Sequence, residues 1–455
     1  MGGHTTEAFG SYDVRGRIPD ELNADIVYDT GRAYANLVKP EGPVAVGHDV
    51  RPSSPELSEA LMRGLNDAGA DAIDIGQVGT EMVYFASAQE GMGGGIMVTA
   101  SHNPSDYNGL KFVRSNAVPI SGDSGLRDIE KMIGEGSMKS APQKGSSRST
   151  DISEAYIGCV LDFVKPEELA PLHFVANAGN GCAGPYLDMI DERVPLHFTR
   201  IDHEPDGTFP QGVPNPLKPN NRERTADAVR ESGASVGVAW DGDFDRCFFF
   251  DENAEFIEGY YLVGLLAQRM LKRHPGAKII HDPRLIWNTI KIVEEEGGTP
   301  IESKTGHAFI KERMRKEDAV YGGEMSAHHY FRDFYYADSG MIPWLLVADI
   351  LTRKQRPLGE LVAEMERDFP CSGEINLEVS DEDTQKAAIE EARETYEAQG
   401  GEVDDTDGVS VAFDRWRFNL RASNTEPVIR LNVESRGDRE LMEEKKNEII
   451  DLITS

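Results

Sequence analysis

Short apolar runs that end abruptly in polar turns recur along the chain. Three of them cover Val44–Gly47, Phe174–Ala176 and Lys278–Ile280, and a segment with helical spacing follows each one. Runs of this length fit buried strands, whereas the segments between them fit amphipathic helices. Because strands and helices alternate, the pattern predicts α/β domains with parallel or mixed sheets.

The segment Pro55–Ala68 is the clearest helix in this pattern. Ser53 and Glu56 have the spacing of a capping box, and the proline suits the first turn. Gly69 follows the last helical position, where glycine commonly ends a helix. We therefore expect a helix that begins at a capped serine and ends at a glycine.

Polar stretches that are poor in large apolar residues mark the expected domain boundaries. The strongest predicted linker is Gly134–Thr150, a second boundary follows Asp251, and a third lies near Arg367–Ser372. These boundaries give three α/β domains and a smaller C-terminal domain. The expected domains cover residues 1–148, 149–252, 253–368 and 369–455.

After about Gly373 the pattern changes to that of an α+β module. It predicts, in order, the strand Ile375–Val379, the helix Glu382–Gln399, two strands around Val409–Val433 and the helix Arg439–Ile453. The fold class expected for the whole chain is therefore three α/β domains with mixed sheets and a C-terminal α+β domain.

Composition and charge narrow the classes of function. The 455 residues carry 79 acidic and 47 basic side chains, a formal net charge of −32. Nucleic-acid binding needs a basic face, so we expect no nucleic-acid partner. No apolar window is long enough to span a bilayer, no signal-peptide pattern opens the chain, and the four cysteines are widely separated. These features predict a cytoplasmic protein with no membrane partner.

Residues 99–104, Thr-Ala-Ser-His-Asn-Pro, carry the most informative candidate. They follow the apolar run Ile96–Val98, and Pro104 disfavours a helical conformation in the residue before it, so the chain turns. We expect Ser101 to be displayed on this turn and available for chemistry, with His102 beside it. An ordinary polar turn is the alternative interpretation.

Three carboxylates stand at alternate positions between two predicted strands. Asp241, Asp243 and Asp245 project to one side of an extended segment and repel one another, so a cation is their natural neutraliser. Oxygen ligands select hard ions, with Mg²⁺ favoured where a phosphate also binds. A calcium-binding EF-hand loop is the rival, but Arg246 stands where that loop requires glycine. An acidic turn without a metal is the other alternative.

A phosphorylated serine would complement these carboxylates. Three carboxylates do not complete an octahedral shell, and phosphoserine at position 101 would supply another anionic oxygen. Phosphoryl transfer needs positioning and charge neutralisation around the transferring group. Arg246 and Lys111 could provide the positive charge.

Two further polar segments suit a sugar phosphate. Glu324, Ser326 and His328 alternate along an expected extended loop, where they could bind vicinal sugar hydroxyls. The segment Arg421–Pro427, followed by Arg430, offers hydroxyls, an amide and arginines to a phosphate. A polar surface loop and an ordinary hairpin turn are the alternatives.

The four motifs, in this order and at these separations, resemble those of the α-D-phosphohexomutase superfamily. Thr99–Pro104 is similar to its phosphoserine loop, Asp241–Arg246 to its metal loop, Gly323–His328 to its sugar-binding loop and Arg421–Pro427 to its phosphate-binding loop. The resemblance covers the whole chain and is strongest to the bacterial phosphomannomutase branch.

The chain also departs from the family at three positions. Ala327 replaces a more usual glycine, Glu81 stands where many relatives have proline, and Arg284 stands where relatives commonly carry lysine. None of these changes removes a group that the reaction needs, but Ala327 makes the preferred sugar less certain than the reaction type.

The resemblance implies four domains around a central active-site cleft, with one motif from each. It implies that Ser101 rests as phosphoserine and that its phosphate, with Asp241, Asp243 and Asp245, holds Mg²⁺. The implied catalytic residues are Ser101, His102, Arg15, Lys111, Arg246 and His328, of which Lys111, His102 and His328 are alternative bases. The implied substrate contacts are Tyr12, Arg284, Lys304, Gly306, His307, Glu324, Ser326, His328, Arg421, Ser423, Asn424, Thr425 and Arg430.

The implied activity is an isomerase reaction that interconverts mannose 6-phosphate and mannose 1-phosphate. It would pass through a phosphoserine enzyme and a hexose 1,6-bisphosphate, which also acts as activator. A phosphoglucomutase or a dual-specificity phosphohexomutase is the nearest alternative, and a metal-dependent sugar phosphatase or a sugar-phosphate binding protein belongs to a different class. The expected partners are small hexose phosphates, and the expected assembly is a monomer or weak dimer.

Overall fold

A computed structural model describes residues 6–422 and 428–454. The chain forms two compact units, each described here by itself. The first unit comprises residues 1–256 and 328–355, and the second comprises residues 257–327 and 356–455. Among the described residues, no helix is both long enough and apolar enough to cross a bilayer.

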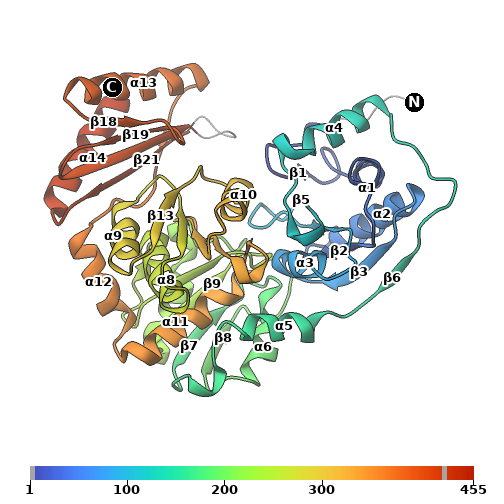
Figure 1. Cartoon of the computed structure of the whole chain (residues 1–455), viewed down its shortest axis with the longest axis horizontal. Helices are drawn as coiled ribbons and strands as arrows, with labels where there is room; N and C mark the ends of the chain where they lie inside the picture. The colour runs from blue at the N-terminus through green and yellow to red at the C-terminus, as the bar shows by residue number, and fades with distance from the viewer. Residues whose placement is uncertain (1–5, 423–427, 455) are drawn as a thin grey trace. The chain divides into compact units, whose positions relative to one another are not determined.

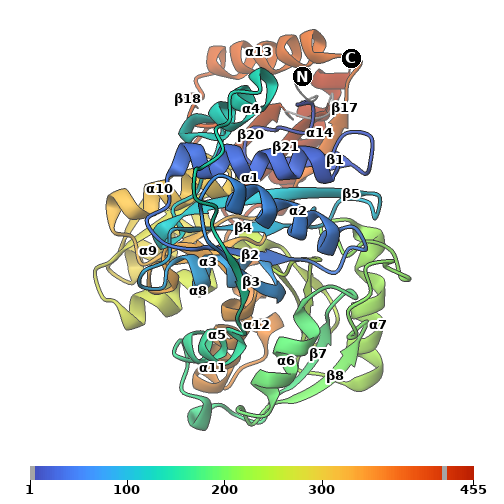
Figure 2. The same cartoon turned by 90° about the vertical axis from the view of Figure 1, so that its right-hand side faces the viewer.

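The N-terminal part of the first unit is built on a mixed six-stranded sheet. Its strands are β1 (Val14–Arg17), β2 (Val44–His48), β3 (Ala72–Gln77), β4 (Gly94–Val98), β5 (Tyr107–Arg114) and β6 (Ser147–Ser149), in the order β1-β5-β4-β2-β3-β6. β4, β2, β3 and β6 run parallel, whereas β5 and β1 are antiparallel to their neighbours. Figure 2 shows β5, β4, β2 and β3 side by side in this order.

Helices cover both faces of this sheet. They are α1 (Ala24–Val38), α2 (Ser54–Asp67), α3 (Thr80–Ser87) and α4 (Leu126–Glu135). Val44 and Val46 of β2 belong to the core under α1 and α2. Strand side chains alternate between faces, so Gly47 lies on the other face, where a Cβ would clash with Val83 of α3. The absent side chain lets α3 approach the end of β2 closely.

The second sheet of the first unit contains the two strands that the turn with the three carboxylates connects. Its strands include β7 (His173–Asn177), β8 (His197–Ile201), β9 (Val236–Trp240) and β10 (Cys247–Phe250). β7 is parallel to β8 and β9, whereas β10 is antiparallel to β9. The accompanying helices are α5 (Ser153–Leu161), α6 (Ala183–Asp191) and α7 (Glu223–Ser232). The unit is completed by β15 (His329–Phe331), β16 (Ala337–Asp338) and α11 (Met341–Lys354), with β15 and β16 antiparallel.

The second unit contains a parallel three-strand core and a separate antiparallel sheet. In the core, β12 (Lys278–His281) pairs in parallel with β13 (Thr299–Glu302) and β14 (Tyr321–Gly323). The helices of this part are α8 (Gly259–Arg273), α9 (Trp287–Glu295), α10 (His307–Glu317) and α12 (Leu358–Asp368).

The C-terminal sheet is antiparallel throughout, in the order β17-β21-β20-β19-β18. Its strands are β17 (Ile375–Glu378), β18 (Glu402–Asp404), β19 (Val409–Ala412), β20 (Trp416–Ala422) and β21 (Val428–Ser435). The helices α13 (Glu382–Ala398) and α14 (Arg439–Thr454) lie against it (Figure 1). The predicted fold class, three α/β regions with parallel and antiparallel strands followed by an α+β module, is confirmed.

Two details of the sequence prediction are wrong, and the predicted linker holds a strand. Ser53 makes no capping bond to α2, because its own backbone is helical, with a φ of −82° and a ψ of −15°; its hydroxyl accepts a hydrogen bond from Asn108 at 2.8 Å. The predicted linker Gly134–Thr150 contains β6, which joins the edge of the first sheet. The region Val409–Val433 forms three strands, because a turn at Phe413 divides the first predicted strand. By contrast, Gly69 follows the end of α2 with a φ of +90°, as predicted.

Candidate active site

The serine loop, residues 99–107, leaves the first sheet at the end of β4. Ser101 has a φ of +48°, in the left-handed region that is uncommon for residues other than glycine. Its N–H donates to Thr99 Oγ1 at 2.9 Å, and its hydroxyl donates to Asp241 Oδ2 at 2.8 Å. The residue is only 2% exposed, so the prediction of a displayed serine is wrong.

Ser101 is buried because the aspartate loop, residues 241–246, packs against the serine loop. The backbone of Gly242 comes so close that a Cβ there would lie 2.7 Å from the carbonyl oxygen of Ser101. The bond from Ser101 to Asp241 joins residues 140 positions apart. A strand-end turn looks exposed when its own segment is considered alone, and a distant loop covers this one.

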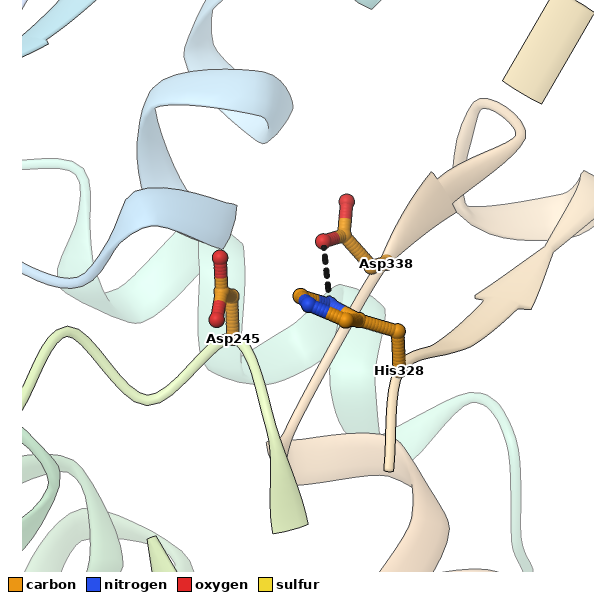
Figure 3. A group of neighbouring side chains, drawn as sticks. All are labelled: Asp245, His328 and Asp338. Carbon is orange, nitrogen blue, oxygen red and sulfur yellow. Dashed lines mark hydrogen bonds and ion pairs between the residues drawn. The ribbon is translucent and has the colours of Figure 1, made fainter. Parts of the chain in front are cut away.

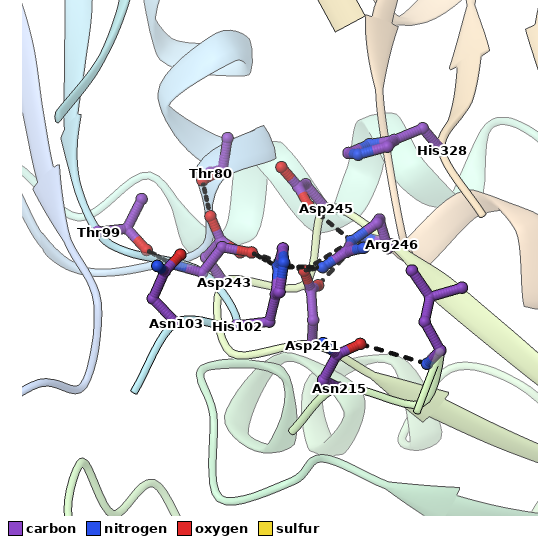
Figure 4. Close-up of polar contacts among 12 residues, drawn as sticks. Thr80, Thr99, His102, Asn103, Asn215, Asp241, Asp243, Asp245, Arg246 and His328 are labelled. Carbon is purple, nitrogen blue, oxygen red and sulfur yellow. Dashed lines mark hydrogen bonds and ion pairs between the residues drawn. The ribbon is translucent and has the colours of Figure 1, made fainter. Parts of the chain in front are cut away.

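The three predicted carboxylates converge in the turn between β9 and β10 (Figure 4). Asp241, Asp243 and Asp245 are all buried, and one oxygen from each lies within 4.8 Å of the others. Within the described part of the chain, Oδ1 of Asp243 and Oδ1 of Asp245 are buried without a hydrogen-bond partner. Buried carboxylate oxygens that lack donors are suited to a hard divalent cation, so the residues fit a metal site.

Positive side chains compensate the carboxylates. The Lys111 ammonium donates to Asp243 Oδ2 at 2.7 Å and to Asp245 Oδ2 at 2.6 Å. Arg246 donates from Nε to Asp241 at 2.9 Å, and Thr80 donates its hydroxyl to Asp243 at 2.5 Å.

These charges shift the pKa values of the cluster. Burial lowers the pKa of Lys111, but Asp243 and Asp245 outweigh burial and raise the pKa above its ordinary range. Burial and the neighbouring Asp243 raise the pKa of Asp245 to about 6. For Asp243, burial acts in the same direction, but Lys111 prevails and lowers the pKa. Lys111 is therefore held protonated beside the carboxylates.

His102 lies between the serine and the arginine of the aspartate loop. Its Nδ1 is 3.0 Å from Ser101 Oγ and also contacts the guanidinium of Arg246. Burial and the charge of Arg246 lower the pKa of His102 well below its ordinary value. The imidazole is therefore neutral, with its Nδ1 already engaged.

Arg15 on β1 reaches the serine loop from the other side. Its Nε donates to Asp13 at 2.9 Å, and its Nη1 donates to the side-chain oxygen of Asn103 at 2.5 Å. Tyr12, half-buried, immediately precedes this pair. The first unit thus brings together the expected serine, aspartates, Lys111, Arg15 and Arg246.

His328 points toward Asp245 (Figure 3). Its Nδ1 lies 3.1 Å from Asp338 Oδ2, and donor atoms of His328, Asp338 and Asp245 lie within 4.8 Å of one another. The expected alternation of Glu324, Ser326 and His328 along an extended loop is wrong. The chain turns instead, with Ala327 at a φ of +71° and its N–H bonded to the Glu324 carbonyl. The left-handed φ explains why glycine suits that position.

Arg284 organises the sugar-loop residues of the second unit. Its guanidinium binds Asp282 at 2.8 Å and Glu374 at 3.2 Å, and lies 3.9 Å from Glu324. It also donates to the Ser326 hydroxyl at 3.4 Å. Glu324 in turn accepts from the Gly306 N–H at 2.9 Å, so the predicted turn at 304–307 adjoins the sugar loop. Lys304 is the first residue of this turn, and His307 begins α10.

The described part of the predicted phosphate-binding segment also belongs to the second unit. Arg421 donates to Asp407 at 3.2 Å, and Asp407 accepts the N–H of Thr305 at 3.1 Å. Arg430 lies 4.0 Å from Glu374, the carboxylate that it shares with Arg284. The remaining predicted contacts, Ser423, Asn424 and Thr425, lie outside the described residues.

Several site residues were not predicted from the sequence. They are Thr80 and Asp338 around the aspartate loop, Asp49 and Arg51 behind the serine loop, and Asp282, Glu374 and Asp407 in the second unit. A usable signal existed for three of them, because His-Asp-x-Arg occurs after β2 at 48–51 and after β12 at 281–284. The others are joined to the site only by contacts distant in sequence.

Four family models match the chain in series. Three are described as α/β/α domains I, II and III of phosphoglucomutase/phosphomannomutase and match residues 6–139, 154–255 and 258–369. The fourth, the C-terminal domain of the same family, matches residues 374–452.

Full-length relatives agree with these matches. The chain is 56% identical over 454 residues to a phosphomannomutase of Salmonella montevideo, covering 98% of this chain and 99% of that protein. It is 54% identical over 449 residues to a protein of Xanthomonas campestris pv. campestris named phosphohexose mutases, covering 99% of each. A crystal structure of a phosphoglucomutase/phosphomannomutase family protein from Burkholderia thailandensis superposes with a TM-score of 0.88 at 30% identity, covering 99% of this chain and 97% of that chain.

Proposed function

We propose, from the premise that this chain belongs to the phosphoglucomutase/phosphomannomutase family of α-D-phosphohexomutases, that it interconverts mannose 6-phosphate and mannose 1-phosphate. The observation that carries the proposal is the buried Ser101 hydroxyl on Asp241, surrounded by two more carboxylates, Lys111 and Arg246. The full-length identity to phosphomannomutases supports mannose as the sugar.

The reaction begins with Ser101 phosphorylated. A sugar hydroxyl oxygen attacks the phosphorus, the bond from phosphorus to Ser101 Oγ breaks, and the hydroxyl proton passes to a base. The product is a hexose 1,6-bisphosphate, which reverses its orientation within the site. Ser101 Oγ then attacks the other phosphate, and the released sugar oxygen regains a proton. Atoms and charge balance over the cycle, because one phosphoryl group leaves Ser101 and another returns.

The site fits Mg²⁺ held by Asp241, Asp243, Asp245 and the serine phosphate, because two buried aspartate oxygens lack donors there. The bound ion would draw negative charge from the transferring phosphoryl oxygens. Arg246 and Lys111 add positive charge from the protein itself, and Arg15 fixes the loop through Asn103.

Among the three expected bases, His328 fits the geometry best. Lys111 is held protonated by two aspartates, and Nδ1 of His102 is already engaged by Arg246 and Ser101. Nδ1 of His328 lies 3.1 Å from Asp338, which orients the ring, and the ring points toward Asp245 of the carboxylate cluster (Figure 3). We therefore assign proton transfer to His328 and give Lys111 the role of charge neutraliser.

The second unit would bind the sugar and the phosphate that is not reacting. Glu324 and Ser326 would hold the same sugar hydroxyls in either orientation of the bisphosphate. The other proposed contacts, which carry hydrogen-bond donors or positive charge, are Tyr12 of the first unit and, in the second unit, Arg284, Lys304, Gly306, His307, Arg421, Ser423, Asn424, Thr425 and Arg430. We propose that the chain divides into domains 1–148, 149–252, 253–368 and 369–455, in a cytoplasmic protein that is a monomer or weak dimer.

A dual-specificity phosphohexomutase is the second candidate. The relative named phosphohexose mutases is 54% identical, nearly as similar as the phosphomannomutases. The epimers differ at one sugar hydroxyl, which Glu324 and Ser326 could bind in either configuration.

Side-by-side turnover of mannose 1-phosphate and glucose 1-phosphate tests the proposal. We expect the 6-phosphate as product with little inorganic phosphate, loss of turnover in Ser101→Ala, and full turnover in Ser105→Ala, which changes an exposed serine of the same loop. Inorganic phosphate as the main product would identify a phosphatase instead. Equal turnover of both sugars would establish the dual enzyme.

A further inference from the structure

Arg51 lies beneath the serine loop with every donor of its guanidinium engaged. The side chain is 1% exposed, and its Nε donates to Asp49 Oδ2 at 3.2 Å. Its four other N–H groups meet main-chain carbonyl oxygens of the serine loop. These acceptors are Ser101 at 3.0 Å, Asn103 at 2.6 Å, Pro104 at 2.5 Å and Tyr107 at 3.0 Å. A guanidinium has five N–H donors, so none is left to bind substrate.

Asp49 connects this arginine to the start of the same loop. It accepts the main-chain N–H of Arg51 at 3.0 Å and the Thr99 hydroxyl at 2.8 Å. Thr99 Oγ1 in turn accepts the N–H of Ser101 at 2.9 Å. The pair therefore holds the reactive serine from its N–H side and from its carbonyl side.

The equivalent arginine of the second unit is used differently. Arg284 follows the same His-Asp-x-Arg pattern, and its N–H donates to Asp282 at 3.0 Å as that of Arg51 does to Asp49. Its terminal nitrogens, however, bind side chains, including those of Glu374 and Ser326. Of these two arginines, Arg51 alone directs both of its terminal nitrogens to main-chain oxygens of a loop.

We propose that Arg51, oriented by Asp49, is a positioning residue that holds the serine loop in the conformation for phosphoryl transfer; the role in transfer rests on the proposed function. Ser101 keeps a left-handed φ, a conformation that persists only where the surroundings enforce it. Four charge-assisted bonds on one side of a single turn provide that enforcement. Lysine offers one point charge in place of a planar fork, so it cannot span four carbonyl oxygens.

Arg51→Lys is the direct test, with Arg32→Lys as its matched control. Arg32 is a half-buried arginine of the same unit whose guanidinium binds the carbonyl of Met138, remote in sequence from the serine loop. We expect Arg51→Lys to lower kcat for mannose 1-phosphate by about 10- to 100-fold with KM within about threefold, because misplacement by an ångström costs about this much. Deuterium exchange should accelerate in residues 99–107 of this variant and stay unchanged in Arg32→Lys.

Asp49→Asn is the second variant and serves if Arg51→Lys does not fold. It keeps the size of the side chain and should produce the same local acceleration of exchange together with a smaller loss of kcat. Unchanged exchange in residues 99–107, or a kcat within twofold of the parent in both variants, overturns the proposal. Absence of mutase turnover in the parent protein contradicts the proposed function instead, and the exchange result still decides whether Arg51 holds the loop.

Discussion

At the scale of single residues, the environment of Ser101 decides what kind of nucleophile it is. Its hydroxyl donates to an aspartate of the proposed metal site, and the neighbouring imidazole is engaged by Arg246. A hydrolase serine needs an oriented base that accepts its proton. Ser101 is better understood as a carrier of phosphate whose oxygen moves between the sugar and the carboxylate cluster.

Glu81, a buried carboxylate outside the proposed site, gives a prediction on pH and stability. Its fully buried carboxylate accepts from the hydroxyls of Tyr156 and Ser339 and from the main-chain N–H groups at the start of α11. Burial raises its pKa to about 8, although these donors lower it. The folded protein therefore keeps this proton until about pH 8, whereas the unfolded chain loses it above about pH 4.5.

The folded state is consequently destabilised as pH rises from about 4.5 to about 8, because there it binds more protons than the unfolded chain. Glu81→Gln has no such proton. We expect its Tm, relative to the parent, to rise between pH 5 and pH 8 by an amount corresponding to about 1–4 kcal/mol. The exposed Glu59→Gln should show no such trend, and a pH-independent difference for Glu81→Gln would mean that the carboxylate is ionised in the fold throughout.

At the scale of elements, loops at strand ends position the chemistry. β4 carries the serine, β9 and β10 carry the aspartates, and β15 and β16 place His328 against Asp338. The runs at β2, β7 and β12 were predictable because buried strands are apolar and short. Ser101 was predictable because it follows a strand-end apolar run, and the three aspartates were predictable because carboxylates at alternate positions indicate a cation site.

Other contacts could not be predicted in this way. Arg51 donates hydrogen bonds to the serine loop, which lies about 50 residues later in the chain. Asp338 contacts His328 only because the β15–β16 hairpin brings the two residues together. Residue spacing carries no information on such pairs. The recurrence of His-Asp-x-Arg marked the right arginines, but the pattern alone does not show that one binds carbonyl oxygens and the other side chains.

The β15–β16 hairpin supports a prediction on proton transfer. Asparagine at position 338 keeps the shape but holds the His328 tautomer less firmly, because its amide can donate as well as accept. We expect Asp338→Asn to lower kcat for mannose 1-phosphate by about 10²-fold with a smaller effect on KM. Steady-state kinetics measure both constants. The control is Asp333→Asn, which changes an exposed residue of the same hairpin. A kcat within twofold of the parent would remove His328 from the proposed role.

At the scale of the whole molecule, the net charge of −32 repels the anionic substrates that we propose. The structure places positive groups locally among acidic ones, with Lys111, Arg15 and Arg246 in the first unit and Arg284, Arg421 and Arg430 in the second. Local clusters act over a few ångströms, whereas the net charge acts at longer range and is screened by salt.

Screening should therefore stabilise the protein. We expect the Tm to rise by several degrees when KCl increases from about 0.05 M to about 1 M, because the Debye length falls below the spacing of many surface charges. Differential scanning calorimetry measures this shift. A Tm that falls or stays constant would show that favourable surface ion pairs outweigh the self-repulsion of the excess acidic groups.

The most direct test of the central claim is mass spectrometry of the phosphoryl group on Ser101. The protein is incubated with magnesium and a hexose 1,6-bisphosphate that carries isotopically labelled phosphoryl groups, freed of the excess bisphosphate, and then mixed with unlabelled mannose 6-phosphate. We predict one labelled phosphoryl group per chain, located on Ser101, that on mixing leaves for mannose 1,6-bisphosphate and then mannose 1-phosphate, while Ser101 regains an unlabelled phosphoryl group from the sugar. Mutase turnover with no phosphate on Ser101, or a label that remains on Ser101 while mannose 6-phosphate is converted, would contradict the account.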